Sequence, residues 1–151
     1  MTDIVFYHLT ATTLDEALPV LVERSRQRDW KVTIQTNSDG ARDRLDGRLW
    51  SYAAESFLPH GRDGDAHEKL HPVFLTTQKD MNQNDSQIRF VVENAALPDQ
   101  LNVFERVAIM FDGNDSDAVD QARANWKALK ADGHQLTYWK QSAEGKWERA
   151  S

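Results

Sequence analysis

The sequence predicts an α/β fold: a three-layer, Rossmann-like, mostly parallel sheet with helices on both faces. Short apolar runs rich in β-branched and aromatic residues alternate along the chain with amphipathic helical patterns, which is typical of βαβ units. With 151 residues, the chain has the size of one domain and can bury a core of its own. Its 40% hydrophobic and 28% charged residues are close to the averages of folded globular proteins.

The first strand and helix are expected near the start of the chain. Residues 4–9 are a nearly continuous apolar run, as in strands that are buried on both faces. A helix over residues 13–28 should follow, because apolar residues recur there every three or four positions. Thr13 and Glu16 have the spacing of a capping box at its start. Pro19 lies past the first turn, where it can kink the helix.

The rest of the chain continues the alternation of strands and helices. A strand over residues 31–36 completes the first βαβ unit. Helices are expected over residues 41–52 and 117–132, the second of them ending at Gly133 as a left-handed cap. Residues 62–68 are expected to form a polar loop. Strands are also expected at residues 72–76, 87–92, 106–111 and 135–140, with residues 146–149 pairing back onto the last of these through a hairpin turn.

Composition limits the classes of function. We expect one domain over residues 1–140 and a C-terminal extension over residues 141–151 that adds a short hairpin strand to it. The absence of Cys excludes disulfides, thiolate zinc sites and a cysteine nucleophile. The start of the chain lacks the pattern of a signal peptide, and no apolar run reaches the ~18 residues of a membrane span. We therefore expect a soluble, cytoplasmic protein.

The net charge of −6 disfavours binding of a nucleic-acid backbone across a broad face. It leaves room for a local basic patch. A nucleotide site would need a glycine-rich turn after the first strand, but the segment LTATTL at residues 9–14 has no glycine. No GxSxG elbow or other ordered nucleophile signature occurs, so we predict no catalytic residue. An enzyme that binds a nucleotide or small anion at the carboxyl edge of the sheet stays an alternative on fold analogy alone.

Candidate metal ligands have simpler interpretations, and we expect neither a metal nor a cofactor. His67 and His71 have the spacing of zinc ligands on a helix, but a Gly/Asp-rich loop precedes them, so they are better explained as solvated loop residues. His60 is expected to make a structural hydrogen bond, and His8 to be a satisfied polar group at the end of a strand. Four acidic residues could suggest Mg²⁺: Asp112, Asp115, Asp117 and Asp120. They are better explained by Asp115 or Ser116 capping the last helix, with the acids complementing its dipole.

A basic stripe is expected on the last helix. Arg123, Lys127 and Lys130 are separated by four and three positions, so they share one helical face, and Trp126 lies in the same turn. Cations beside a flat apolar ring suit an acidic peptide that ends in an aromatic residue, because Arg can bind a carboxylate bidentately. The alternative is that Trp126 belongs to the core and the basic residues form a solvated face.

Several motifs, taken jointly, resemble one protein family. They are LDGRLW at residues 45–50, ESFLPH at residues 55–60 and ARANWK at residues 122–127, with FY at residues 6–7 and YWK at residues 138–140. Over about residues 1–140 the chain resembles the chi subunit of bacterial DNA polymerase III holoenzyme. The resemblance implies a non-catalytic clamp-loader accessory subunit in DNA replication, a component of a nucleotidyltransferase complex.

The resemblance also implies partners and sites. In chi subunits the last helix is associated with capture of the C-terminal tail of single-stranded DNA-binding protein, and Arg123, Trp126 and Lys127 match the family's positions, with Trp where Tyr is common. Trp50 and Phe57 lie in the region associated with the psi subunit, which joins chi to the clamp loader. They can equally be packed under the loop. A chi-like adaptor that serves a helicase instead is a further alternative.

Overall fold

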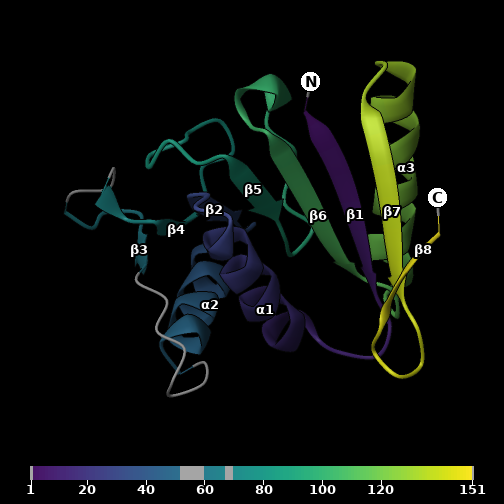
Figure 1. Ribbon diagram of the computed structural model, residues 1–151, viewed down its shortest axis with the longest axis horizontal. Helices are drawn as coiled ribbons and strands as arrows, with labels where there is room; N and C mark the ends of the chain where they lie inside the picture. The colour runs from purple at the N-terminus through teal and green to yellow at the C-terminus, as the bar shows by residue number, and fades with distance from the viewer. Residues whose placement is uncertain (1, 52–59, 67–69, 151) are drawn as a thin grey trace.

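The computed structural model describes residues 2–51, 60–66 and 70–150, and these residues form a layered α/β structure (Figure 1). The helices are α1 (Leu14–Gln27), α2 (Asp39–Ser51), the short 3-10 helix η2 (Leu101–Val103) and α3 (Ser116–Ala131). The strands are β1 (Asp3–Leu9), β2 (Val32–Gln35), β3 (His60–Arg62), β4 (Val73–Thr76), β5 (Ile88–Val91), β6 (Arg106–Asp112), β7 (Gln135–Gln141) and β8 (Trp147–Arg149).

Within the described residues the strands form one sheet in the order β3-β4-β2-β5-β6-β1-β7-β8. All neighbouring pairs are parallel except β7 and β8. In the centre, β1 pairs with β6 and β7, so that Phe6 lies between Ile109 and Tyr138. The last strand returns through a turn in which Gly145 has a φ of 83°, a conformation that favours glycine. The predicted hairpin onto β7 is therefore present.

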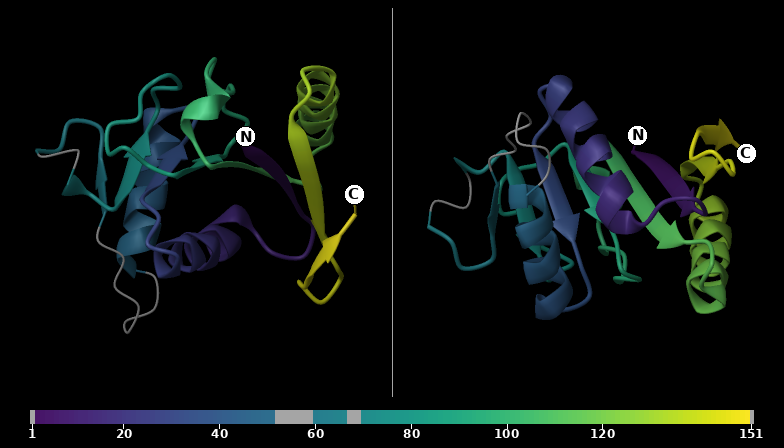
Figure 2. Two further views of the ribbon diagram at one scale, coloured as in Figure 1. Left: turned by 45° about the horizontal axis from the view of Figure 1, so that its top comes forward. Right: turned by 90° about the horizontal axis from the view of Figure 1, so that it is seen from below.

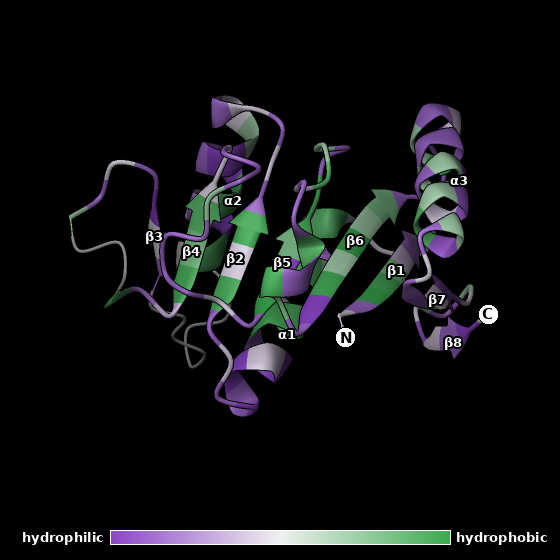
Figure 3. Cartoon of the chain, turned by 90° about the horizontal axis from the view of Figure 1, so that it is seen from above, coloured by the Kyte–Doolittle hydropathy of each residue, from purple (hydrophilic) through white to green (hydrophobic). Residues whose placement is uncertain are grey.

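Helices cover both faces of the sheet, as the predicted three-layer fold requires (Figure 2). Alternate residues of the central strands point to opposite faces. On β6, Ala108 and Met110 pack toward α1 and α2, whereas Val107 and Ile109 pack toward η2 and α3. Figure 3 shows the central strands as the most hydrophobic part of the chain, while α3 alternates between hydrophobic and hydrophilic positions. The two cores thus share one sheet.

Several helix ends lie at the capping residues that were predicted. Thr13 is the N-cap of α1, and Glu16 completes the capping box. Asp115 is the N-cap of α3, where its side chain accepts hydrogen bonds from the backbone N–H groups of Asp117 and Ala118. Gly133 follows α3 with a φ of 83°. The N-cap role of Asp115 confirms the capping interpretation for this member of the acidic group.

One expectation needs correction. The segment expected as a polar loop over residues 62–68 is preceded by β3, which pairs with β4 and reaches Arg62. Sequence patterns missed it because three residues are too few to show a period of two.

Pro19 lies inside α1, which runs from Leu14 to Gln27, as the sequence predicted. Among the helices of the described residues, none has the length and apolar character of a membrane span.

Candidate partner-binding surface on helix α3

Helix α3 is held against the sheet by one apolar face, which leaves the opposite face to solvent. Ala118, Ala122 and Leu129 are buried against the core formed with β1, β6 and β7. Their spacing of four and seven residues is the period of a helix that packs along one stripe. The helix runs beside β7 (Figure 1). Small alanines at two of the three buried positions leave little apolar bulk between helix and sheet.

The predicted basic stripe is present on the exposed face. Arg123, Lys127 and Lys130 are all exposed. Within the described part of the chain none of the three has an acidic side chain within 4.0 Å. Three cations on one helical face are therefore available for an anionic partner, and their attraction for it is screened over about 8 Å at physiological salt.

Trp126 lies at the border between this stripe and the core. Its ring makes edge contacts with Phe6, at 5.3 Å between ring centroids, and with Tyr138, at 5.7 Å. It is half-buried, so the rest of the indole stays accessible. The sequence allowed Trp126 to be either a core ring or a surface ring. One part of the indole packs in the core and the other part lies at the surface, so each interpretation describes part of the side chain. An accessible indole fixed by packing can offer apolar contact at little cost in side-chain entropy.

Behind Trp126 the structure brings together residues that the sequence did not single out as a group. The Nδ1 atom of His8 is 2.6 Å from the hydroxyl of Tyr138, and the His8 ring contacts Phe111 with 4.8 Å between centroids. The predicted role of His8 as a satisfied polar group is confirmed. A signal that could have revealed this cluster is the shared face of the parallel strands β1 and β7. In this pairing Phe6 is the partner of Tyr138, and His8 is the partner of Lys140.

The cluster and the stripe are electrostatically connected. Burial lowers the pKa of His8, and the positive charges of Lys140 and Arg123 lower it further, while Asp112 opposes them. Burial raises the pKa of the Tyr138 hydroxyl, and Arg123 partly offsets that effect. The end of β1, the end of β7 and the middle of α3 therefore form one positive, aromatic surface. Such a surface has the chemistry needed to hold an anion beside a ring.

The second predicted site is only partly described. Trp50 belongs to α2, but its side chain lies outside the described residues, as does the whole of Phe57. The neighbouring positions Leu45 and Leu49 are buried in the core, 1% and 3% exposed. His60, the last residue of the ESFLPH motif, is buried, and its Nε2 lies 3.1 Å from Asp46 Oδ1. The expected structural hydrogen bond of His60 is thus confirmed.

In the crevice where a Rossmann-like enzyme would bind a nucleotide, a side chain of the protein itself occupies the backbone donors. It lies at the carboxyl ends of β1 and β6, where connections leave toward opposite faces, and has a volume of about 510 Å³. The backbone N–H groups of Thr10, Ala11 and Thr12 all donate to Oε1 of Gln141, at 3.0, 3.1 and 3.1 Å. A phosphate would need these same donors. Carboxylates of Asp112 and other residues line the crevice and repel anions.

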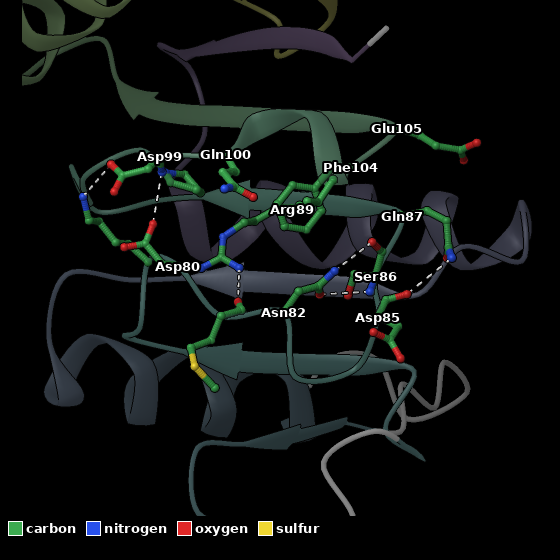
Figure 4. A pocket seen from close by; sticks show the side chains of 14 residues that line it. Asp80, Asn82, Asp85, Ser86, Gln87, Arg89, Asp99, Gln100, Phe104 and Glu105 are labelled. Carbon is green, nitrogen blue, oxygen red and sulfur yellow. Dashed lines mark hydrogen bonds and ion pairs between the residues drawn. The ribbon is translucent and has the colours of Figure 1, made fainter.

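A larger cavity, of about 850 Å³, is built around a structural arginine (Figure 4). Arg89 is 0% exposed and donates to Gln35 Oε1 at 2.9 Å and to the carbonyl oxygens of Met81 and Gln78 at 2.6 and 2.7 Å. Burial lowers the pKa of Arg89 to about 10. Its donors face the protein's own oxygens, so we assign it a structural role in joining β5, β2 and the loop after β4.

Among the described residues no group of three or more His, Asp or Glu side chains has the geometry to hold a metal ion. His67 lies outside the described residues. His71 places its Nε2 3.2 Å from the carbonyl oxygen of Ala66, which occupies one of its ring nitrogens.

Comparison with known proteins gives two findings. The family model described as "DNA polymerase III chi subunit, HolC" matches residues 1–137. A curated protein of Rickettsia prowazekii (strain Madrid E), "Probable DNA polymerase III subunit chi", is 23% identical over 112 residues, which cover 70% of this chain and 67% of the relative. Residues 1–137, which the family model matches, contain the whole of α3 and both predicted sites.

Proposed function

The chain belongs to the DNA polymerase III chi subunit family, and from this premise we propose that it is a non-catalytic adaptor of the replication machinery. It binds the C-terminal tail of single-stranded DNA-binding protein and links that protein to the clamp loader. The adaptor acts in the cytoplasm, where a bacterial chromosome is replicated. Its mechanism is tethering, because linkage raises the local concentration of partners without any chemical step.

The observation that carries this proposal is the group of unpaired cations beside the half-buried indole on α3. Arg123 can bind the terminal carboxylate of the tail bidentately, and Lys127 adds a point charge for its acidic residues. Trp126 offers apolar contact to the aromatic residue at the tail's end, and Lys130 extends the positive stripe by one turn. A short tail meets only this local surface, so the net charge of −6 is no obstacle.

The link to the clamp loader is assigned to the region of α2 and the segment that follows it in the sequence. There we expect Trp50 and Phe57 to contact a psi-like subunit, since aromatic residues are common anchors of protein interfaces. We expect Trp50→Ala with Phe57→Ala to abolish co-purification with such a subunit and to leave tail binding unchanged. Loss of a helicase instead of the clamp loader from the co-purified proteins would indicate the helicase adaptor.

Tail capture is tested by titrating a fluorescent peptide with the sequence of the tail against the wild type, Arg123→Ala and Lys127→Ala. Each substitution should weaken binding about 5- to 20-fold, since a charge-assisted hydrogen bond contributes ~1–2 kcal/mol. Binding should also fall as salt rises. Lys79→Ala is the matched control: it removes the same charge from an exposed lysine that pairs with Asp99 in another part of the sheet.

Either of two results would contradict this assignment. A well-folded wild type that does not bind the tail would show that the inherited function has been lost. Equal weakening by Lys79→Ala and by Lys127→Ala would show that general charge, and not the α3 surface, is responsible for binding.

A further inference from the structure

A groove on the sheet face opposite α3 combines aromatic rings with arginines. It has a volume of about 490 Å³, within the ~300–1,000 Å³ range of ligand pockets. Tyr7 of β1 and Trp139 of β7 are direct partners in the parallel pairing, and Trp139 is the partner of Arg149 on β8. These three side chains therefore form a row across three strands. The ring of Trp147 meets that of Tyr7 edge to face at 5.1 Å and closes one end.

The groove exists because α1 does not reach the outer strands. This helix packs over the centre of the sheet, against β2 and β6, and only Leu21 and Arg24 of α1 line the groove. Beyond them, no helix of the described residues covers β1, β7 and β8 on this face (Figure 2). Tyr7, Trp139 and Trp147 are only half-buried, so their rings are accessible from solvent.

Positive charge surrounds these rings. The described residues that line the groove include three arginines and one carboxylate. They are Arg24, Arg106, Arg149 and Asp3. Arg106 is 3.8 Å from Asp3, but its Nε atom is buried with no hydrogen-bond acceptor among the described residues. The hydroxyl of Tyr7 likewise makes no hydrogen bond within the described residues, and Arg24 and Arg106 are the charges that act on it. The Tyr7 hydroxyl is therefore available to an acceptor such as a phosphate oxygen.

We propose that this groove binds a short segment of single-stranded nucleic acid, with bases stacked on the aromatic row and phosphates held by the arginines. Ring faces beside a positive groove are the usual means of binding single strands without sequence preference, and an open sheet face can present them. A duplex keeps its base faces stacked internally, so it does not fit. An acidic peptide with one terminal aromatic residue, as proposed for α3, would satisfy the arginines but would match only one ring of the row.

The groove is separate from the surface assigned to tail capture. It lies on the other face of the sheet from α3, and it shares no residue with the stripe of Arg123, Lys127 and Lys130. Trp139, Trp147 and Arg149 also lie beyond residue 137, where the family match ends. Nucleic-acid binding here would therefore be a property of this chain's C-terminal strands.

The test is fluorescence anisotropy of labelled oligo(dT) and oligo(rU), each about 8 nucleotides long, with the full-length protein over a range of salt concentrations. Trp147→Ala should weaken binding about 5- to 100-fold, the equivalent of one lost base stack. Trp147→Phe should restore most of the affinity. Arg24→Ala should lower the slope of log affinity against log salt by about 0.7, as expected for one lost phosphate contact. Lys79→Ala should match the wild type.

Arg24 is exposed on the surface of α1, so its variant tests the groove even if Trp147→Ala disturbs β8. Absence of oligonucleotide binding at low salt, or unchanged binding in both Arg24→Ala and Trp147→Ala, would overturn the proposal. Binding of an acidic peptide that is lost in these two variants, without binding of either oligonucleotide, would show a peptide groove and would also overturn it. None of these results depends on whether α3 captures the tail.

Discussion

His8 is the residue whose surroundings most affect the candidate surface. It lies at the end of β1 with Tyr138 as its hydrogen-bond partner at 2.6 Å. Burial, Lys140 on β7 and Arg123 on α3 disfavour its protonation, whereas Asp112 at the end of β6 favours it. Gly113 makes this position possible: a Cβ atom there would lie 2.2 Å from the His8 ring. His8 is therefore held as a mainly neutral ring next to the α3 cations.

This arrangement predicts a pH dependence of stability. The pKa of His8 is lowered in the folded state, so below its ordinary value of about 6.5 the unfolded chain binds more protons than the folded one, and the free energy of unfolding falls as pH falls. We expect wild-type protein to lose more stability than His8→Gln between about pH 7.5 and pH 5. Urea denaturation at each pH measures this difference. Identical losses in the two proteins would show that folding does not lower the pKa of His8.

At the residue scale the sequence predicted what depends on near neighbours. The cap at Asp115, the capping box of Thr13 and the end of α3 at Gly133 involve residues within four positions of each other. The bond between His8 and Tyr138 joins residues 130 positions apart and depends on the register of β1 with β7. Likewise, nothing in LTATTL indicates that Gln141 takes the donors of that turn. The absence of glycine there was a sign in the sequence against nucleotide binding, and it contained no information about Gln141.

At the scale of elements, Pro19 explains how α1 is joined to α2. Proline has no N–H, so the carbonyl oxygen of Asp15, four positions earlier, loses its helical partner. Arg48 of α2 supplies the replacement, since its Nε donates to that oxygen at 2.9 Å. Arg44 adds an ion pair with the Asp15 side chain. A residue that appeared to weaken α1 thus creates an acceptor for the neighbouring helix.

A double-mutant cycle tests this coupling between the helices. Arg48→Ala should cost about 1–2 kcal/mol of stability in the wild type, because it leaves the Asp15 oxygen without a partner. In the Pro19→Ala background the helix supplies its own N–H, so the same substitution should cost less, with a coupling of at least ~0.5 kcal/mol. Denaturant unfolding of the four proteins measures it. Additive costs would mean that the oxygen is satisfied by water when Arg48 is absent.

The described elements that the sequence missed, β3 and η2, are among the shortest, whereas β8, equally short, was predicted from its hairpin turn. The longer strands and all three α-helices have enough residues to show a period, and their predicted ranges differ from the observed ones by only a few residues. β3 has three residues, and η2 has three. Both depend on neighbours distant in the chain, β4 for the strand and the core around Phe104 for the turn.

At the scale of the whole molecule, charge is distributed unevenly. Arg42, Arg44, Arg62 and Lys79, which belong to the half of the sheet near α2, are all ion-paired with carboxylates. The cations of α3 and Arg24 have no such partner among the described residues. An acidic chain can thus present two positive surfaces at one end, because most of its neutralised cations lie at the other. This separation could not be predicted from net charge, which contains no information on position.

The two positive surfaces lie on opposite faces of the same sheet, and this placement predicts that they act independently. A tail peptide on α3 and a single strand in the groove are both anionic, but helix and sheet layers separate them by more than the ~8 Å over which charges interact at physiological salt.

The affinity for labelled oligo(dT) should therefore change less than about twofold when the protein is saturated with tail peptide, a coupling below ~0.5 kcal/mol. Anisotropy titrations with and without the peptide measure it, and Lys127→Ala, which should lose the peptide, serves as the control. Displacement of the oligonucleotide by the peptide would mean that the two ligands share one surface. Simultaneous binding would make this subunit a point of contact with both the single strand and the protein that coats it.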